Sequence, residues 1–174
     1  VHYEGTRDGK SYGGNRFSDF YSKMYPSMDW MDEHVSAFEK PLFVCEYAHA
    51  MGNAIGNLKE YWESIEGSTA TIGGAIWDWV DQAIYEPHEI KKGIYRLHTG
   101  YDFPGPHQGN FCSNGIVPAT REESPKLKEV KAIYQYVAFK CVGTDASHNV
   151  VNVQVRNKYA FLSLKGFDLK WESV

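Results

Sequence analysis

Residues 42–79, LFVCEYAHAMGNAIGNLKEYWESIEGSTATIGGAIWDW, carry the pattern that decides the fold class. A short apolar run at 42–47 precedes a helical stretch at 54–66, and a second apolar run follows at 74–79. Apolar residues of the helical stretch recur at the spacing of one helix face: Leu58, Tyr61, Trp62 and Ile65. Strand, helix and strand in this order predict a βαβ unit with parallel strands.

The same alternation extends to both sides of this unit. Two more strands are predicted at Val1–Glu4 and Phe20–Tyr25, and two more helices at Met28–Glu39 and Pro125–Val137. The last helix opens with Ser124 as N-cap and Pro125 as its first residue. A complete (β/α)8 barrel needs roughly 250 residues. We therefore expect an α/β fold in which residues 1–137 form half of such a barrel.

Residues 138–174 have a different pattern of apolar and polar residues. Apolar and polar residues alternate at 150–155 and again at 160–164, for example, which predicts an all-β region of three or four strands. Three or four strands are fewer than a sandwich needs, so we expect the start of an immunoglobulin-like β-sandwich domain. The first residues lack an initiating Met, and we expect a chain cut from a longer protein at both ends.

Composition excludes several classes of function. The net charge of −4 comes from 22 acidic and 18 basic residues without blocks, so neither a nucleic acid nor an anionic membrane surface is an expected partner. No apolar run approaches the roughly 20 residues needed to span a bilayer. The three cysteines lack the spacing of a disulfide framework or a zinc site. The compartment stays open between cytoplasm and periplasm, because any signal peptide would precede Val1.

Polar residues at the strand ends are the candidate functional residues. A barrel enzyme builds its active site at the carboxyl ends of the strands. Glu4, Tyr25, Glu46 and the segment 77–79 occupy these positions. A carboxylate such as Glu46 is costly to bury unless it has partners or a chemical function. An ion pair with an arginine of a neighbouring strand is the structural alternative.

Three ordered segments resemble known signatures. Residues 44–53, VCEYAHAMGN, closely resemble the nucleophile signature of the β-galactosidases of glycoside hydrolase family 2. Residues 73–82, GGAIWDWVDQ, and residues 110–117, NFCSNGIV, resemble the next two signatures of that family. The resemblance covers residues 1 to about 137 and implies strands five to eight of the barrel. It implies retaining hydrolysis of terminal β-D-galactose from β-galactosides such as lactose.

The resemblance also implies catalytic roles. Glu46 ends strand seven and is the expected nucleophile, with a second carboxyl group about 5–5.5 Å away as acid/base. That acid/base ends strand four in the family and lies upstream of Val1, so we expect the isolated chain to be inactive. Tyr25 matches the tyrosine that hydrogen-bonds the nucleophile and helps the galactosyl group to leave. A rim tyrosine is the alternative for Tyr25.

Four further residues match binding positions of the family. His49 is expected to bind sugar hydroxyls, and Trp77 to form one wall of the galactose site, since the C–H face of a sugar packs on an aromatic ring. Without the motif, both would be read as core residues. Phe111 and Asn114 are expected at the galactose site and as ligands of Na⁺, through a backbone and a side-chain oxygen respectively. One further Na⁺ ligand and the Mg²⁺ ligands are expected upstream.

Some segments depart from the family pattern, and other readings stay open. Residues 99–105 and 86–97 differ from the usual loops, so the aglycone side is not defined. Asp78 and Asp81 are expected to brace the strand-eight loop. The alternatives are a β-glucuronidase or β-mannosidase of the same family, or a non-catalytic carbohydrate-binding relic. A β-galactoside is the expected partner, and the family suggests a homo-oligomeric parent enzyme, such as a tetramer.

Overall fold

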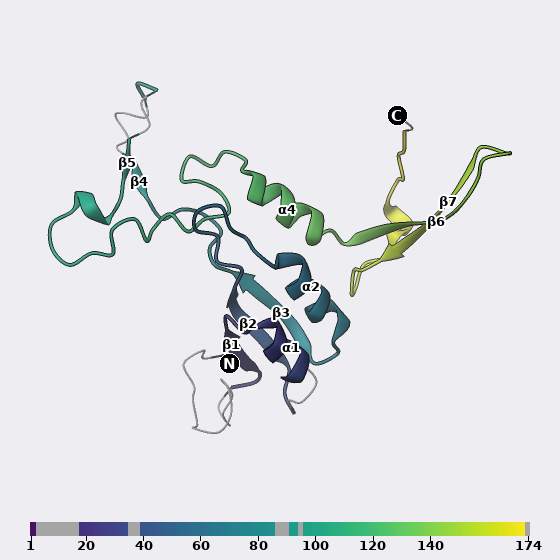
Figure 1. Ribbon diagram of the computed structural model, residues 1–174, viewed down its shortest axis with the longest axis horizontal. Coiled ribbons are helices and arrows are strands. Elements are labelled where there is room, and N and C mark those ends of the chain that lie inside the picture. Colours follow the sequence, from purple (N-terminus) through teal and green to yellow (C-terminus); the bar gives the residue numbers. More distant parts are fainter. Residues whose placement is uncertain (3–17, 35–38, 86–90, 94–95, 173–174) are drawn as a thin grey trace. The chain divides into compact units, whose positions relative to one another are not determined.

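The computed structural model describes residues 1–2, 18–34, 39–85, 91–93 and 96–172 (Figure 1). The chain divides into two compact units, Val1–Ile133 and Tyr134–Val174. The first unit alternates strands with helices, in agreement with the expected α/β class. No helix in the described ranges is long and apolar enough to cross a membrane.

A three-stranded parallel sheet is the centre of the first unit. Its strands are β1 (Tyr21–Met24), β2 (Leu42–Tyr47) and β3 (Thr71–Ile76), in the order β1-β2-β3. The helices α1 (Met28–His34) and α2 (Leu58–Gly67) follow β1 and β2. α1 contacts α2, and α2 contacts β3, so both helices cover the same face of the sheet (Figure 1).

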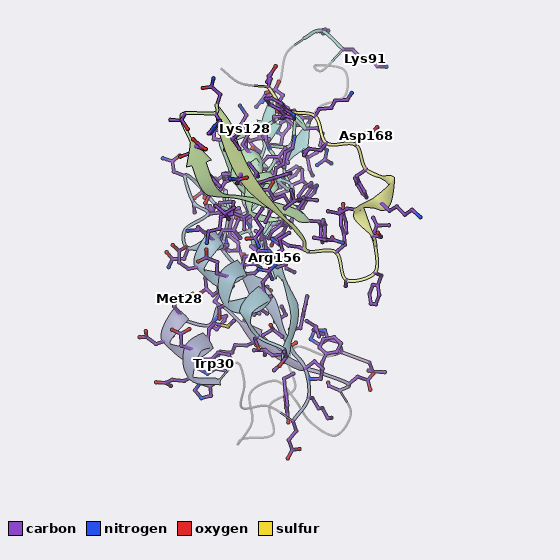
Figure 2. All side chains as sticks on the ribbon, turned by 90° about the vertical axis from the view of Figure 1, so that its right-hand side faces the viewer. Met28, Trp30, Lys91, Lys128, Arg156 and Asp168 are labelled. Carbon is purple, nitrogen blue, oxygen red and sulfur yellow. The ribbon has the colours of Figure 1, made fainter. Side chains whose placement is uncertain are left out.

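The core forms between β2 and these helices. Leu42, Val44 and Tyr47 of β2 are fully buried, as expected for a central parallel strand. Leu58 and Ile65 of the predicted apolar stripe of α2 are buried as well. On α1, the ring of Trp30, which is labelled in Figure 2, stacks on the ring of His34. The ammonium of Lys23 lies over the Trp30 ring, 5.5 Å from its centre.

The boundaries of two predicted elements were wrong. β3 begins at Thr71 instead of Gly74, because Gly74 lies inside the sheet, where a Cβ would come within 3.0 Å of the Val44 carbonyl oxygen. Glycine there permits close strand packing and does not interrupt the strand. α2 begins at Leu58 instead of Ala54, because Asn57 has a left-handed backbone with φ 59° that a helix cannot contain.

Other predicted elements fall partly outside the described ranges. The strand predicted at Val1–Glu4 includes Tyr3 and Glu4, which lie outside them, and the described Val1 and His2 are not in a strand. The helix predicted at Met28–Glu39 is described as far as His34, and its predicted end was wrong, because Glu39, the next described residue, is in a bend. Residues 86–90 and 94–95, in the segment that departs from the family pattern, also lie outside.

The end of the first unit is a long loop followed by a helix. Two short strands, β4 (Ile84–Tyr85) and β5 (Leu97–His98), form an antiparallel pair, and the 3-10 helix η1 (Gly100–Asp102) follows. The helix α4 (Pro125–Ile133) begins as predicted, since the Ser124 hydroxyl accepts a hydrogen bond from Leu127 N at 3.2 Å. α4 ends before Val137, which belongs to the next strand.

The second unit is a two-stranded hairpin with an irregular tail. β6 (Val137–Asp145) and β7 (Val150–Asn157) pair in antiparallel register. The strand predicted at 160–164 was wrong, because residues 160–161 form a bend, 162–163 are irregular and Leu164 begins the 3-10 helix η2 (Leu164–Gly166). The amide of Asn157 donates to the Leu162 carbonyl at 2.8 Å and so folds this segment into a turn, with Phe161 fully exposed.

Candidate active site at the carboxyl ends of the parallel strands

A β-bulge sets the direction of the Glu46 side chain. Lys23 pairs with Val44, but Met24 pairs with Glu46, so Cys45 is an extra residue in β2. Burial changes phase at the same point: Leu42 and Val44 are buried, and Tyr47, rather than Glu46, is the next fully buried residue. A strict alternation would have placed the carboxylate on the same face as Val44. The bulge therefore leaves Glu46 half-buried at the end of the strand.

Tyr25 contacts Glu46 through both backbone and side chain. Its N–H donates to the Glu46 carbonyl at 2.8 Å, and its hydroxyl hydrogen-bonds the Glu46 carboxylate. Burial raises the pKa of Tyr25 above its ordinary value, and the hydrogen bond to Glu46 and its charge raise it further. Tyr25 thus stays a hydroxyl donor at neutral pH. The structure brings the two predicted catalytic residues together.

A tyrosine of α2 supports the turn that contains Tyr25. Tyr25 has φ 45°, a left-handed conformation that is uncommon for a bulky residue. The next residue, Pro26, accepts a hydrogen bond at its carbonyl from the Tyr61 hydroxyl. Burial raises the pKa of Tyr61, so this donor is also retained. In the sequence, Tyr61 is visible only as part of an apolar stripe.

His49 lies between two other predicted site residues. Its ring centroid is 6.0 Å from that of Tyr25 and 5.6 Å from that of Phe111. The Nδ1 atom of His49 accepts a hydrogen bond from Met51 N at 3.3 Å, so in the neutral ring the proton is on Nε2. His49 can therefore offer one N–H donor to a ligand hydroxyl.

Trp77 directly follows β3, and its backbone is hydrogen-bonded to the end of β2 and to the loop after it. Its N–H donates to the Tyr47 carbonyl at 3.1 Å, and its carbonyl accepts from Ala50 N at 2.6 Å. The Trp77–Asp78 peptide bond is cis. No feature of the sequence indicates this bond. These contacts hold Trp77 beside the segment that contains His49.

Asn114 has a side-chain oxygen without a hydrogen bond. The residue is 1% exposed, and its Nδ2 donates to the Phe111 carbonyl at 3.0 Å. Within the described residues, its Oδ1 atom is buried and has no hydrogen-bond partner. A buried oxygen of this kind needs a partner. The Asn114 amide therefore offers a buried oxygen while its nitrogen contacts the Phe111 carbonyl, and oxygen atoms suit a hard cation.

The two aspartates after Trp77 brace their loop, as predicted. Asp78 accepts hydrogen bonds from Trp79 N at 2.5 Å and from the Gln82 amide at 2.6 Å. Asp81 accepts one from Gly115 N at 2.7 Å. Both carboxylates therefore have structural partners. No cluster of three or more His, Cys, Asp or Glu that could hold a metal occurs among the described residues.

The contacts of Lys126 with two loops of the site were not predicted from the sequence. The Lys126 ammonium donates to the carbonyls of Ala50, at 2.7 Å, and Gly115, at 2.6 Å, and more weakly to that of Gly52, at 3.4 Å. One side chain of α4 thereby joins the loop of His49 to the loop of Asn114. Its position in the first turn of a helix, where a cation is unfavourable, is the signal that could have identified it.

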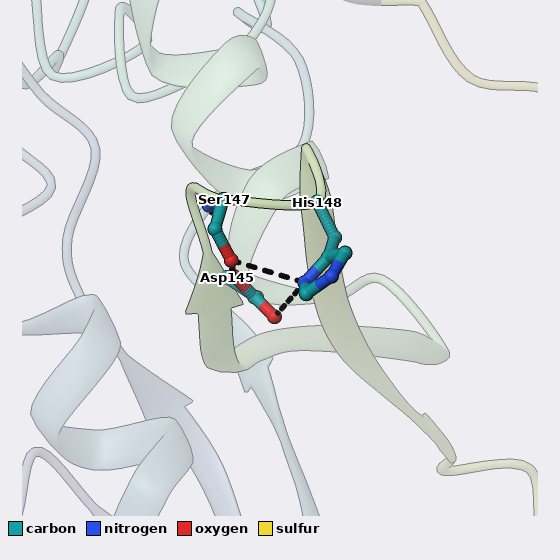
Figure 3. A network of polar contacts seen from close by, with 3 residues as sticks. All are labelled: Asp145, Ser147 and His148. Carbon is teal, nitrogen blue, oxygen red and sulfur yellow. Dashed lines mark hydrogen bonds and ion pairs between the residues drawn. The ribbon is translucent and has the colours of Figure 1, made fainter.

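Outside this site, a cluster of three polar residues lies in the β6–β7 turn (Figure 3). The carboxylate of Asp145 accepts from the Ser147 hydroxyl at 2.6 Å and contacts His148 Nδ1 at 2.7 Å. The hydrogen bonds from Ser147 and His148 lower the pKa of Asp145. A catalytic triad needs the serine at the opposite ring nitrogen from the aspartate. Here the Ser147 hydroxyl also faces Nδ1, and all three residues are exposed, so the cluster is a turn motif.

Comparison with known proteins relates the chain to one enzyme family. Residues 1–139 match the family model described as glycosyl hydrolases family 2, TIM barrel domain. Over 98% of its length, the chain is 40% identical to a protein of Priestia megaterium named β-galactosidase, and it covers 16% of that protein. β-Galactosidases of Lactococcus lactis and Kluyveromyces lactis are 34% and 33% identical, over 99% and 94% of the chain.

The chain spans less than a fifth of the length of these relatives, since it covers 18% of the Lactococcus protein and 16% of the Kluyveromyces protein. The family model covers well over half of the chain and includes every candidate residue described above. The chain therefore belongs to glycoside hydrolase family 2.

Proposed function

We propose that the full-length protein containing this chain is a retaining β-galactosidase with Glu46 as its nucleophile. The observation that carries the proposal is the pair formed by Glu46, at the carboxyl end of a parallel strand, and the hydroxyl of Tyr25 bonded to its carboxylate. The names of the three relatives, all β-galactosidases, support galactose as the sugar. The ion-pair alternative for Glu46 has less support, since its assigned partner is Tyr25.

The proposed reaction is a double displacement. The Glu46 carboxylate attacks the anomeric carbon, and the leaving oxygen takes a proton from a second carboxyl group, expected outside this chain. Water then attacks the same carbon after losing its proton to that second group, and Glu46 leaves as a carboxylate. The Tyr25 hydroxyl donates to the Glu46 oxygen that carries the developing negative charge, which favours this departure.

Sugar recognition is assigned to the residues around Glu46. The Nε2–H of His49 suits a galactose hydroxyl, and the indole of Trp77 suits the C–H face of the ring. Phe111, whose side chain is 46% exposed and packs near His49, would extend the same wall. The β-galactoside is therefore the proposed partner of this surface.

The backbone oxygen of Phe111 and the Oδ1 atom of Asn114 would hold a monovalent cation such as Na⁺. The buried, unpartnered Oδ1 atom supports this assignment, together with the oxygen-only donor set. When bound, such an ion supplies positive charge to sugar hydroxyl oxygens. The remaining Na⁺ ligand and the Mg²⁺ ligands are proposed to lie elsewhere in the full-length protein, as is any interface of a homo-tetramer.

The fold supports the same proposal. A parallel sheet in strand order, with its helices on one face, is the arrangement of a (β/α)8 barrel wall. We propose that β1, β2 and β3 belong to the second half of such a barrel, strands five to eight. The β6–β7 hairpin would begin an immunoglobulin-like sandwich, because an isolated hairpin is marginally stable.

A labelling experiment tests the proposed function. The full-length protein is treated with an activated 2-fluoro-β-galactoside, which forms a covalent glycosyl-enzyme on the nucleophile, and the labelled peptide is identified by mass spectrometry. We expect the label on Glu46, and none in Glu46→Gln. The corresponding glucuronide and mannoside reagents serve as controls for the related activities. A label on another carboxylate, or faster labelling by either control reagent, contradicts the proposal.

A further inference from the structure

We infer that Lys126 is a positioning residue that holds the sugar-binding loops of this site in their active arrangement. The inference rests on the proposed function for its effect on galactoside binding. An ammonium has three N–H donors, and here they face three backbone carbonyls, those of Ala50, Gly52 and Gly115. The side chain thus acts as a clamp between loops that are distant in sequence.

The clamped carbonyls are next to the proposed binding residues. Ala50 directly follows His49, and Gly115 directly follows Asn114. The N–H of Ala50 also donates to the carbonyl of Trp77 at 2.6 Å. A single ammonium therefore relates the positions of His49, Asn114 and Trp77, which come from three separate loops.

The loop at Gly115 has little freedom to adjust if the clamp is lost. A Cβ at Gly115 would lie 2.2 Å from Asp81 N and 2.4 Å from the Val117 carbonyl oxygen, so the backbones are already in close contact. The Gly115 N–H also donates to the Asp81 carboxylate. A carbonyl that loses its donor here can regain one only if the loop moves or water enters.

Helix stability alone does not account for this lysine. Lys126 is in the first turn of α4, where the helix dipole disfavours a positive charge, and that turn contains no acidic residue. Lys128, two residues further along the same helix, is exposed to solvent. Contact with the three carbonyls offsets the unfavourable position of Lys126.

The geometry predicts how loss of the Lys126 clamp should affect KM and kcat separately. Tyr25 and Glu46 are joined by the β1–β2 pairing, which Lys126 does not contact. The residues next to the clamp are those proposed to bind the sugar. Loss of the clamp should therefore raise KM more than it lowers kcat. Simple destabilisation would instead reduce the active fraction and lower kcat at unchanged KM.

The test compares Lys126→Met with Lys128→Met, a matched change at an exposed position of α4 (Figure 2), in the full-length protein. For a chromogenic β-galactoside, we expect Lys126→Met to raise KM at least about fivefold with kcat within about threefold of wild type. Lys128→Met should stay within about twofold in both, and Lys126→Arg, which keeps the charge and donors, should recover part of the loss. An unchanged KM overturns the inference, as does a fall in kcat alone.

Hydrogen exchange gives a readout that needs no turnover. In Lys126→Met we expect faster exchange of backbone amides in 48–53 and 113–117, with the amides of β2 unchanged. If the full-length protein hydrolyses no galactoside, the proposed function fails while this measurement still tests the clamp. Equal exchange in wild type and variant overturns the inference. Should Lys126→Met not fold, Lys126→Gln, with two N–H donors on a shorter side chain, carries the same tests.

Discussion

The Tyr25 hydroxyl hydrogen-bonds the Glu46 carboxylate, and the Tyr25 N–H donates to the Glu46 carbonyl at 2.8 Å. Two neighbouring strands are thus joined twice at the same pair of residues. The backbone bond depends on the pairing of β1 with β2, and the side-chain bond depends on the turn at Tyr25. Glu46 therefore has a partner that orients its carboxylate without neutralising its charge.

Replacing the proposed nucleophile should remove catalysis and retain binding. In full-length Glu46→Gln, we expect kcat to fall well over tenfold with little change in KM, because the substitution deletes bonding made only in the transition state. Glu60→Gln, at an exposed position of α2, is the matched control and should leave kcat unchanged. Steady-state kinetics checks both, and Glu46→Gln retaining more than about a tenth of kcat would contradict the assignment.

Tyr25 should remain protonated through the alkaline range of activity. Its pKa is raised by burial, by the hydrogen bond to Glu46 and by the charge of Glu46. A raised pKa in the folded state contributes stability that is complete below the ordinary tyrosine value of about 10 and is lost above it. An ultraviolet difference titration between wild type and Tyr25→Phe should show a tyrosine that ionises only above about pH 10. Ionisation below that pH would refute the contact.

Trp77 should contribute to galactose affinity. Trp77→Ala is expected to weaken competitive inhibition by galactose by about 1–3 kcal/mol, or roughly fivefold to 150-fold, since it removes one aromatic contact with the sugar. Trp77→Phe retains an aromatic face and should lose less. If galactose binds equally well to all three proteins in a titration, Trp77 is a packing residue and not a wall of the site.

Tyr61 should support the turn at Tyr25. Removing its hydroxyl in Tyr61→Phe deletes the hydrogen bond to the Pro26 carbonyl, with an expected cost of about 0.5–1.5 kcal/mol. Thermal unfolding of the full-length protein should therefore begin at a lower temperature, and kcat should fall modestly. Tyr101→Phe is a suitable control, because Tyr101 is 71% exposed. Equal melting of both variants would argue against a supporting role.

A polypeptide of these 174 residues alone should not hydrolyse lactose. The proposed acid/base is outside it, and loss of general-acid assistance typically costs about 10²–10⁴-fold. The edges of the β1-β2-β3 sheet would also be open to aggregation. Binding of a hydrophobic dye and the lack of a cooperative melt would identify misfolding as the cause. Clear turnover of lactose by the purified chain would mean that an acid/base residue within it has been overlooked.

The elements with the strongest periodicity could be predicted from the sequence. β2 has the bounds predicted for it, because a short, mainly apolar run is typical of a buried strand in a parallel sheet. α4 begins at Pro125 as predicted, because a serine followed by proline satisfies a free helix N-terminus locally. Element ends that depend on non-local contacts were missed, as at Gly74, where a neighbouring strand decides whether glycine ends the sheet.

For the site, His49, Phe111 and Asn114 were identified by the resemblance of their segments to the family signatures. The sequence by itself determined that Tyr25, Glu46 and Trp77 are at strand ends. Residue order along a parallel sheet is sufficient for that, because all the carboxyl ends meet at one edge. Only the tertiary structure decided which way they point. The bulge at Cys45 exchanges the faces of Glu46 and Tyr47, and Lys126 donates to a carbonyl 76 residues earlier in the chain. Both depend on contacts between distant segments, and short-range periodicity carries no record of such contacts.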